Sequence, residues 1–171
     1  PTTMKSLPLT IFIIIATILT FFYIATSPNQ ELYDYFTENK ELTSYTEKEA
    51  IHLEEVKTLL NLAFSILFIT APLINLKTIK QTGKQLIIIP IILSLTAIIS
   101  FNNFFIYFHK IFFTTNNWLL PSNSLLIQTY PLSFFYKITL AILITILIEG
   151  IILLQTSHSL SHVRPHKKHY I

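Results

Sequence analysis

Residues 7–25 read LPLTIFIIIATILTFFYIA and contain no charged side chain. In a helix, about 20 apolar residues rising 1.5 Å each span the ~30 Å hydrocarbon core of a bilayer. A cleaved signal peptide is the alternative, but the apolar region of such a peptide normally covers only about 7–15 residues. The stretch therefore predicts an uncleaved transmembrane helix and assigns the chain to the membrane proteins.

The composition of the whole chain agrees with this interpretation. Of its 171 residues, 51% are hydrophobic and 12% are charged, whereas soluble domains carry about 25% charged residues. The chain has no cysteine, which excludes a thiol nucleophile, a disulfide framework and a cysteine-based zinc site. The formal net charge of +3 is small, so the positions of the basic residues are more informative than their sum.

Three further apolar stretches are long enough to cross a bilayer. We expect transmembrane spans at residues 7–25, 56–76, 86–108 and 134–154, with two long polar loops at 26–55 and 109–133. Residues 1–171 then form a single all-α membrane domain with four transmembrane helices. The sequence TEKE at 46–49 fits a capping box, so the second helix is expected to start in the first polar loop and to continue unbroken into the membrane.

The basic residues predict which side of the membrane each loop faces. Lys5 precedes the first span, three lysines lie in the short loop between the second and third spans, and three basic residues lie in the C-terminal tail. Cytoplasmic loops are enriched in Lys and Arg, so both termini and the short basic loop are expected in the cytoplasm. The two long loops are then expected to form a cap at the extracellular face.

Two histidines are expected to meet at this face. His52 lies four residues before the apolar body of the second helix, and His109 directly follows the third predicted span. Consecutive helices joined by a short connection are antiparallel neighbours. Near pH 7 one imidazole can take or give a proton while a second orients or polarises the reacting group. His52 and His109 are therefore the candidate catalytic residues.

Five other residues are candidates for supporting these histidines or binding substrate: Asn102, Glu49, Glu55, Tyr107 and Trp118. The Asn102 amide could donate a hydrogen bond to a developing oxyanion. A carboxylate from Glu49 or Glu55 could hold the His52 ring in one tautomer, as in catalytic triads. Tyr107 and Trp118 fit the aromatic belt at a membrane surface.

Other interpretations of these residues are open at this point. Each histidine could be an amphipathic anchor at the membrane surface, and a glutamate beside both could complete a zinc site. The tail histidines, His158, His162, His166 and His169, fit a solvated or headgroup-binding tail. Glu149 is the only acid inside the fourth span, which makes it a functional candidate unless it reaches the membrane surface or pairs with a lysine.

Several segments resemble a family of small bacterial integral membrane proteins, the lipoprotein intramolecular transacylases. The segments are YDYF at 33–36, EAIHLEEVK at 49–57, NNFFIYFHKIFF at 102–113, NNW at 116–118, Pro121, Pro131, and FF at 134–135. The block that contains His109 is the more specific of the two histidine motifs. The chain departs from the family pattern in its low glycine content and its histidine-rich tail.

The resemblance implies an acyltransferase of the bacterial cell membrane, in a Gram-positive organism. It would move the sn-2 acyl chain of a diacylglyceryl-cysteine lipoprotein onto the α-amino group of the same cysteine, which gives the lyso-form lipoprotein. Catalysis by His52 and His109 would need no metal, no cofactor and no covalent acyl-enzyme. The expected partners are diacylglyceryl-modified lipoproteins and membrane phospholipid, with no nucleic acid. A non-enzymatic four-helix membrane subunit or lipid-binding scaffold is the rival interpretation, and a zinc-dependent membrane hydrolase is a third.

Overall fold

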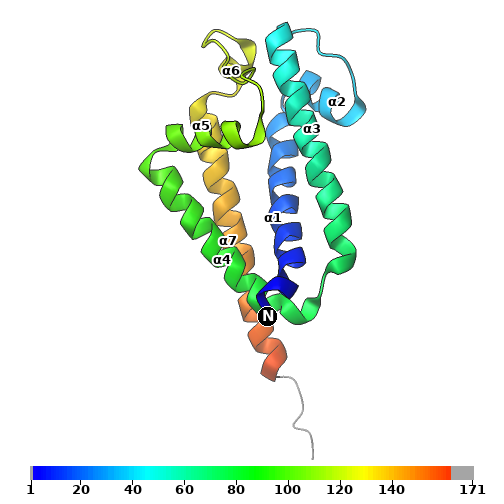
Figure 1. Cartoon of the computed structure of the whole chain (residues 1–171), viewed down its shortest axis with the longest axis vertical. Coiled ribbons are helices and arrows are strands. Elements are labelled where there is room, and N and C mark those ends of the chain that lie inside the picture. The colour runs from blue at the N-terminus through cyan, green and yellow to red at the C-terminus, as the bar shows by residue number, and fades with distance from the viewer. Residues whose placement is uncertain (1, 163–171) are drawn as a thin grey trace, which may run out of the picture.

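The computed structural model describes residues 2–162 and is helical throughout its ordered elements (Figure 1). The elements are α1 (Thr2–Thr26), α2 (Gln30–Glu38), α3 (Glu47–Thr70), the short 3-10 turns η1 (Ala71–Leu73) and η2 (Leu76–Thr78), α4 (Ile79–Ile99), α5 (Phe101–Phe112), α6 (Leu125–Thr129) and α7 (Leu132–His162). Four helical stretches are long and apolar enough to cross a membrane, namely Thr3–Thr26, Glu47–Leu73, Leu76–Ile99 and Leu132–Ser161. The predicted all-α, four-span membrane architecture is confirmed.

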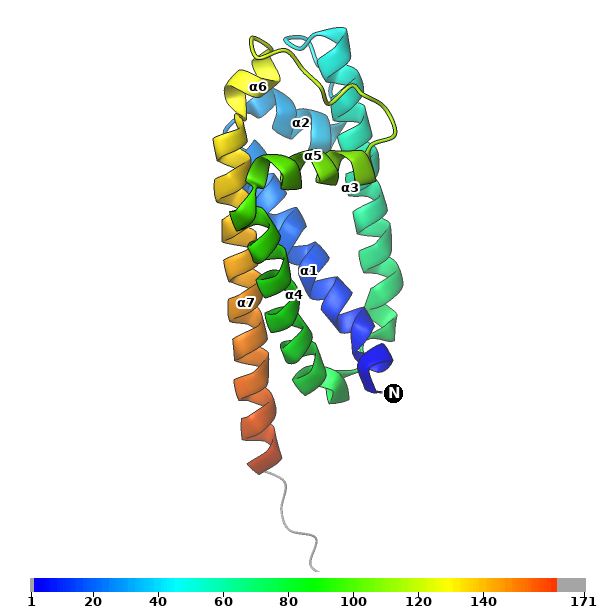
Figure 2. The ribbon, with the colours of Figure 1, turned by 60° about the vertical axis from the view of Figure 1, so that its left-hand side comes forward.

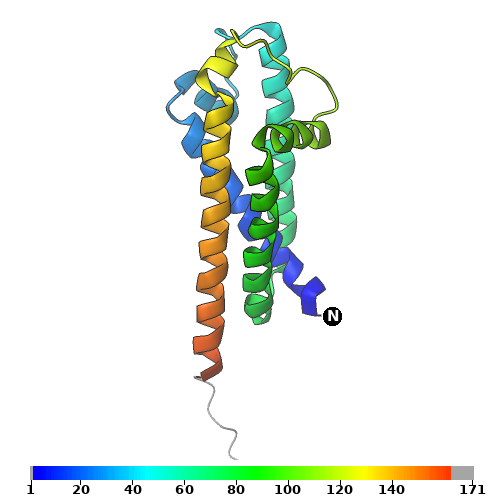
Figure 3. The same cartoon turned by 90° about the vertical axis from the view of Figure 1, so that its left-hand side faces the viewer.

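The spans stand side by side, and the remaining elements gather at one end. The beginning of α1 and the end of α7 lie at the opposite end (Figures 1 and 2). We call the gathered elements α2, α5 and α6, with the segments that connect them to the spans, the cap. Within it, α2 and α5 lie on opposite sides of α7 (Figure 3).

The two glycines of the chain bring α4 and α7 into close contact, and this pair forms the most extensive helix packing in the described structure. A Cβ atom added at Gly83 would lie 3.0 Å from the Gly150 carbonyl oxygen, and one added at Gly150 would lie 3.0 Å from the Gly83 carbonyl oxygen. Small residues let transmembrane backbones approach in this way. Elsewhere α1 packs against α3, α4 and α7.

The start and end of α3 agree with the sequence. Thr46 accepts a hydrogen bond from the Glu49 backbone N–H, and the Glu49 carboxylate reaches back to the Thr46 backbone N–H, which confirms the predicted capping box. The helix then runs unbroken to Thr70, where η1, containing Pro72, replaces it. His52 therefore lies on a continuous helix that carries it from the cap toward the membrane.

The predicted third span at 86–108 is wrong in extent, because the structure divides it at Ser100. α4 ends at Ile99, Ser100 is extended (φ −160°, ψ 95°), and its side chain accepts a hydrogen bond from the Asn103 N–H as the N-cap of α5. α5 then runs across the bundle rather than along it (Figure 2). The serine supplies a new helix start, so Asn102 and His109 belong to a separate, crosswise helix.

A small hydrophobic core holds the cap on the bundle. It consists of Leu32 and Tyr35 from α2, Leu53 from α3, and Tyr130, which lies between α6 and α7. Lys57 of α3 donates a hydrogen bond to the Tyr35 carbonyl oxygen (2.8 Å) and lies over the Tyr35 ring at 4.0 Å. We refer to these four buried residues as the cap core, and it fixes α2 against α3 beside His52.

Glu149 has a partner inside the bundle. The Thr17 hydroxyl of α1 donates to both Glu149 carboxylate oxygens of α7, at 3.0 and 3.1 Å. This contact satisfies an acid within a membrane-spanning segment and fastens α1 to α7.

Candidate active site

The structure brings His52 of α3 and His109 of α5 together at the cap end of the bundle. The ring centroids are 6.0 Å apart and the ring planes are inclined by 36°. Only 7% of His52 and 8% of His109 are exposed. The two rings come from elements far apart in sequence, and together they form a buried pair.

The hydrogen bond of His109 determines its tautomer. Its Nδ1 atom lies 2.8 Å from the Phe105 carbonyl oxygen, one turn earlier in α5. A carbonyl oxygen only accepts, so Nδ1 carries the hydrogen and Nε2 of the neutral ring keeps a free lone pair. Burial lowers the pKa of His109, and the bond to Phe105 opposes this shift in part. At neutral pH His109 is thus an uncharged ring with a basic Nε2.

A carboxylate lies behind His52. The Nδ1 atom of His52 is 3.6 Å from Glu55 Oε2, one turn along α3, and neither atom has a hydrogen-bond partner among the described residues. The second oxygen, Glu55 Oε1, accepts a hydrogen bond from the Thr115 hydroxyl at 2.6 Å. Glu55 therefore connects the cap segment that follows α5 to the face of α3 that carries His52.

Aromatic side chains enclose both imidazoles. The Phe113 ring contacts His52 (5.0 Å between centroids) and His109 (5.3 Å). Trp118 lies 5.0 Å from His109 on the cap segment, and Phe105 lies 4.1 Å from it within α5. This enclosure accounts for the burial of the pair, and it leaves few neighbouring groups that could compete for the imidazole nitrogens.

The Glu49 side chain forms its hydrogen bonds with Thr46 and Leu126 and not with His52. Its carboxylate accepts hydrogen bonds from the Thr46 N–H (2.9 Å), the Thr46 hydroxyl (2.7 Å) and the Leu126 N–H (2.8 Å), and only 1% of the residue is exposed. It fastens α6 to the start of α3. Of the two glutamates considered from the sequence, Glu55 is the one beside the His52 ring.

Asn102 and Tyr107 lie apart from the two rings. Asn102 is an exposed residue in the first turn of α5, and its seven-residue separation from His109 corresponds to about 10 Å along a helix. Tyr107 is 64% exposed. The structure therefore supplies no contact through which either residue would act on the histidine pair.

Two of the neighbours were not identified from the sequence. Thr115 lies sixty residues from Glu55 and has no local signal, because a threonine in a polar loop is common. The role of Phe105 rests on its backbone carbonyl, which any residue at that position would supply. Its location four residues before His109 in a helix was the available clue.

The described residues contain no set of side chains suited to bind a metal ion. Within residues 2–162 there is no group of three His, Asp or Glu side chains that could hold a metal ion. The zinc alternative built on His52, His109 and a glutamate therefore lacks such a group. His166 and His169 of the tail lie outside the described residues.

Comparisons with known proteins identify the family. The chain matches a solved structure, the membrane-integral lipoprotein intramolecular transacylase Lit from Bacillus cereus, with a TM-score of 0.71 over 94% of this chain and 90% of that one. At 21% sequence identity this match establishes a shared fold. An uncharacterized protein of Aquifex aeolicus (strain VF5) is 27% identical over 121 residues, which are 66% of this chain and 56% of the relative. The chain thus spans little more than half the length of that relative.

The sequence profile of one family matches residues 30–135, which include α2, α3, α4, α5 and α6 in full. The matched region contains both histidines and all five supporting candidates. The chain belongs to the lipoprotein intramolecular transacylase Lit family.

Proposed function

We propose that this protein is a membrane acyltransferase that moves the sn-2 acyl chain of a diacylglyceryl-cysteine lipoprotein to the α-amino group of the same cysteine. The family membership supports the reaction class. The observation that carries the proposal for the site is the buried pair of imidazoles, 6.0 Å apart, from two elements of the matched region. The product is the lyso-form lipoprotein, with an amide at the N-terminus and a free glyceryl hydroxyl.

The reaction needs little from the protein beyond proton transfer and charge stabilisation. Amine and ester belong to one substrate molecule, so proximity is largely supplied by the substrate itself. The amine nitrogen attacks the ester carbonyl carbon, a C–N bond forms, the C–O bond to glycerol breaks, and one proton passes from nitrogen to the glyceryl oxygen. Each step occurs on the substrate, so no covalent acyl-enzyme and no cofactor is required.

We assign the proton transfer to His52. Glu55 faces its Nδ1, and a carboxylate in this place stabilises the imidazolium that forms when a ring takes up a proton. His52 would accept the proton from the attacking amine and return it to the glyceryl oxygen. Such general acid–base catalysis typically contributes about 10²–10⁴-fold.

His109 would act as the neutral partner. With Nδ1–H bound to the Phe105 carbonyl, its Nε2 can accept a hydrogen bond from the substrate amine and direct the nitrogen lone pair at the ester. Its lowered pKa keeps the ring uncharged at neutral pH. Trp118, whose ring packs on His109, carries an indole N–H that only donates, and we propose it as the donor to the oxyanion.

The cap end is proposed to face the cell exterior. Lys77, Lys80 and Lys84 lie in η2 and the first turns of α4, at the end of the bundle opposite the cap (Figure 1). By the distribution of basic residues that end is cytoplasmic. The histidine pair would then meet lipoproteins anchored in the outer leaflet.

Mass spectrometry of a lipoprotein N-terminal peptide tests the proposal. In a bacterial host without its own enzyme, expression of this protein is expected to convert the diacylglyceryl form into the lyso form. His52→Ala and His109→Ala are expected to abolish the conversion, while His158→Ala, at the far end of α7, is the matched control. A non-enzymatic scaffold predicts that the lipoprotein stays in the diacylglyceryl form in all four strains. Full conversion by both active-site variants would refute the assignment of the pair.

A further inference from the structure

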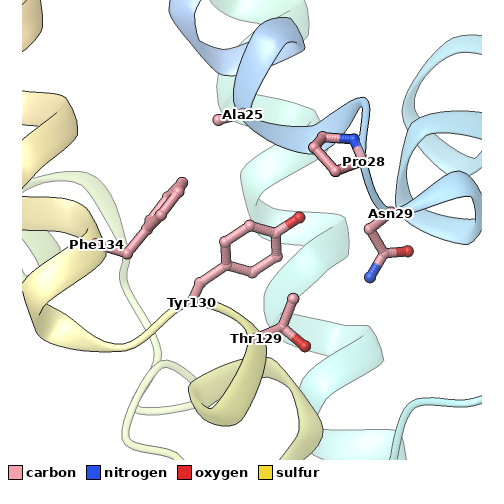
Figure 4. Close-up of a pocket in the computed structure, with 6 residues that line it drawn as sticks. All are labelled: Ala25, Pro28, Asn29, Thr129, Tyr130 and Phe134. Carbon is pink, nitrogen blue, oxygen red and sulfur yellow. The ribbon is translucent and has the colours of Figure 1, made fainter.

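A cavity of about 380 Å³ opens between the cap and the ends of two spans (Figure 4). Its lining comes from the end of α1, the start of α2, the end of α6 and the start of α7. Ala25, Pro28 and Phe134 supply apolar walls, and Asn29, Thr129 and Tyr130 supply polar groups. No lining residue is charged, and the cavity is open on one side.

Tyr130 is the distinctive group in this cavity. It is 9% exposed, its ring packs edge-to-face on Phe134 at 5.0 Å, and its hydroxyl points toward Pro28 (Figure 4). The hydroxyl makes no hydrogen bond to any described residue. Burial raises the pKa of Tyr130, so the phenol stays protonated and remains a donor. The phenol can therefore donate a hydrogen bond to a ligand that enters from the open side of the cavity.

The other polar groups in the lining are already occupied. The Thr129 hydroxyl donates to the Leu125 carbonyl oxygen at 2.8 Å. Asn29 accepts from the Leu32 N–H at 3.1 Å and donates to the Tyr45 hydroxyl at 2.9 Å. The ligand therefore has to offer an acceptor to Tyr130 and an apolar body to the remaining walls, and since no lining residue carries a positive charge, an uncharged acceptor fits the site best.

The location of the cavity indicates which molecule could supply both the hydrogen-bond acceptor and the apolar body. α1 ends at Thr26 and α7 begins at Leu132, so the cavity lies at the cap-side ends of two helices that are long and apolar enough to cross a membrane. Glycerolipids place their ester carbonyls at this depth, directly above the acyl chains. We propose that the cavity binds one glycerophospholipid of the leaflet at the cap end, with an acyl chain along Phe134 and an ester carbonyl accepting a hydrogen bond from Tyr130.

This lipid site is distinct from the histidine pair. Tyr130 belongs to the cap core together with Leu53, the residue that follows His52 in α3. Neither histidine lines the cavity, and His109 is carried by α5, which lies on the other side of α7 from α2 (Figure 3). A bound lipid would support the packing of α2 and α6 without entering the reaction.

Photocrosslinking of the full-length protein tests the proposal. The protein is reconstituted in vesicles containing a phosphatidylcholine with a diazirine on the first methylenes of one acyl chain, and labelled peptides are mapped by mass spectrometry. Labelling is expected to concentrate at residues 25–29 and 129–134. Tyr130→Phe removes one hydrogen bond and is expected to reduce this labelling about two- to tenfold, whereas Tyr136→Phe, the matched control on the exposed surface of α7, leaves it unchanged. Ala25→Leu, which fills the cavity, reduces it without removing a polar atom.

Three outcomes would overturn the inference. Equal labelling in wild type and Tyr130→Phe would show that the hydroxyl does not hold the lipid. Labelling at residues 25–29 and 129–134 no stronger than at the exposed α4 residues Ile91, Ile92, Ile98 and Ile99 would show ordinary annular lipid. Displacement of the label by a synthetic diacylglyceryl lipopeptide would assign the cavity to the substrate instead. Crosslinking does not depend on acyl transfer, so the same result in His109→Ala separates this inference from the proposed activity.

Discussion

Replacement of Thr115 by valine isolates the contact between the cap and the histidine pair. The change preserves side-chain shape and removes the hydroxyl that donates to Glu55 Oε1 at 2.6 Å. Glu55 then loses its anchor outside α3, and its other oxygen, 3.6 Å from His52 Nδ1, is free to rotate away from the ring. On the proposed mechanism this weakens stabilisation of the imidazolium in the transition state.

The size of the effect follows from this one hydrogen bond. Hydrogen bonds to charged groups contribute about 1.5–3 kcal/mol. Thr115 is exposed, so we take the lower end, about 1.5 kcal/mol, which corresponds to at most about a tenfold loss in rate. We expect kcat to fall roughly three- to tenfold with little change in KM, because the contact acts on charge that develops during the reaction.

Glu55→Gln should cost more than Thr115→Val. Two unit charges 3.6 Å apart attract by about 4–5 kcal/mol at an effective dielectric constant of ~20. If roughly half of this is offset by desolvation, about 2 kcal/mol of transition-state stabilisation is lost, or close to thirtyfold in kcat. In the Glu55→Gln background, Thr115→Val should add little, since both changes act on the same group.

The assay is single-turnover conversion of a diacylglyceryl lipopeptide by purified protein in vesicles, followed by mass spectrometry. Thr114→Val is the matched control, because it removes the same hydroxyl from the neighbouring exposed residue. Thermal unfolding should be similar for both threonine variants. If Thr115→Val retained kcat within twofold of Thr114→Val, the proposed role of the Thr115–Glu55 contact would be refuted.

Three further predictions concern the framework and the charge state of the site. Glu49→Ala removes a buried acceptor from three donors and should lower the free energy of unfolding by about 2–3 kcal/mol. Glu47→Ala, at an exposed position, is the control and should leave the free energy of unfolding unchanged. Equal melting temperatures for the two variants would contradict the structural role of Glu49. Gly150→Ala should lower the melting temperature, because the added Cβ would lie 3.0 Å from the Gly83 carbonyl oxygen. Alanine is otherwise the better helix former, so a raised melting temperature would show that α4 and α7 move apart to accommodate the methyl group at little cost. The folded-state pKa of His109 is lowered, so its unfolded form takes up a proton first as pH falls below about 6.5 and stability declines there. His109→Gln should therefore lose less stability than wild type between pH 7.5 and 5.5 in thermal unfolding, and an identical loss would argue against a neutral buried ring.

The four spans and the start of α3 could be predicted from the sequence, because both depend on local patterns. Long apolar runs need no partner to be recognised, and the capping box at Thr46 lies within four residues. The break at Ser100 was missed because the apolar character of α4 continues into the aromatic residues of α5, so no change of composition marks the boundary. Ser100, followed by Phe101 and then by Asn102 and Asn103, was the only signal of a new helix start.

The surroundings of the histidines were harder to predict than the histidines themselves. The Glu49 carboxylate bonds to the Leu126 N–H across 77 residues, and Glu55 bonds to Thr115 across 60. Only the folded cap decides which glutamate is structural and which lies beside His52. Asn102 was chosen because seven residues return a helix to the same face, but the same spacing also separates it from His109 by two turns.

A double-mutant cycle on the two imidazoles tests the central claim most directly. Single-turnover kcat is measured for wild type, His52→Ala, His109→Ala and the double variant, with folding verified by thermal unfolding. If the rings act as one unit on one step, each single variant loses at least about 10²-fold and the double variant loses no more than the worse single one. Losses that multiply in the double variant would contradict a cooperating pair and would show two independent contributions.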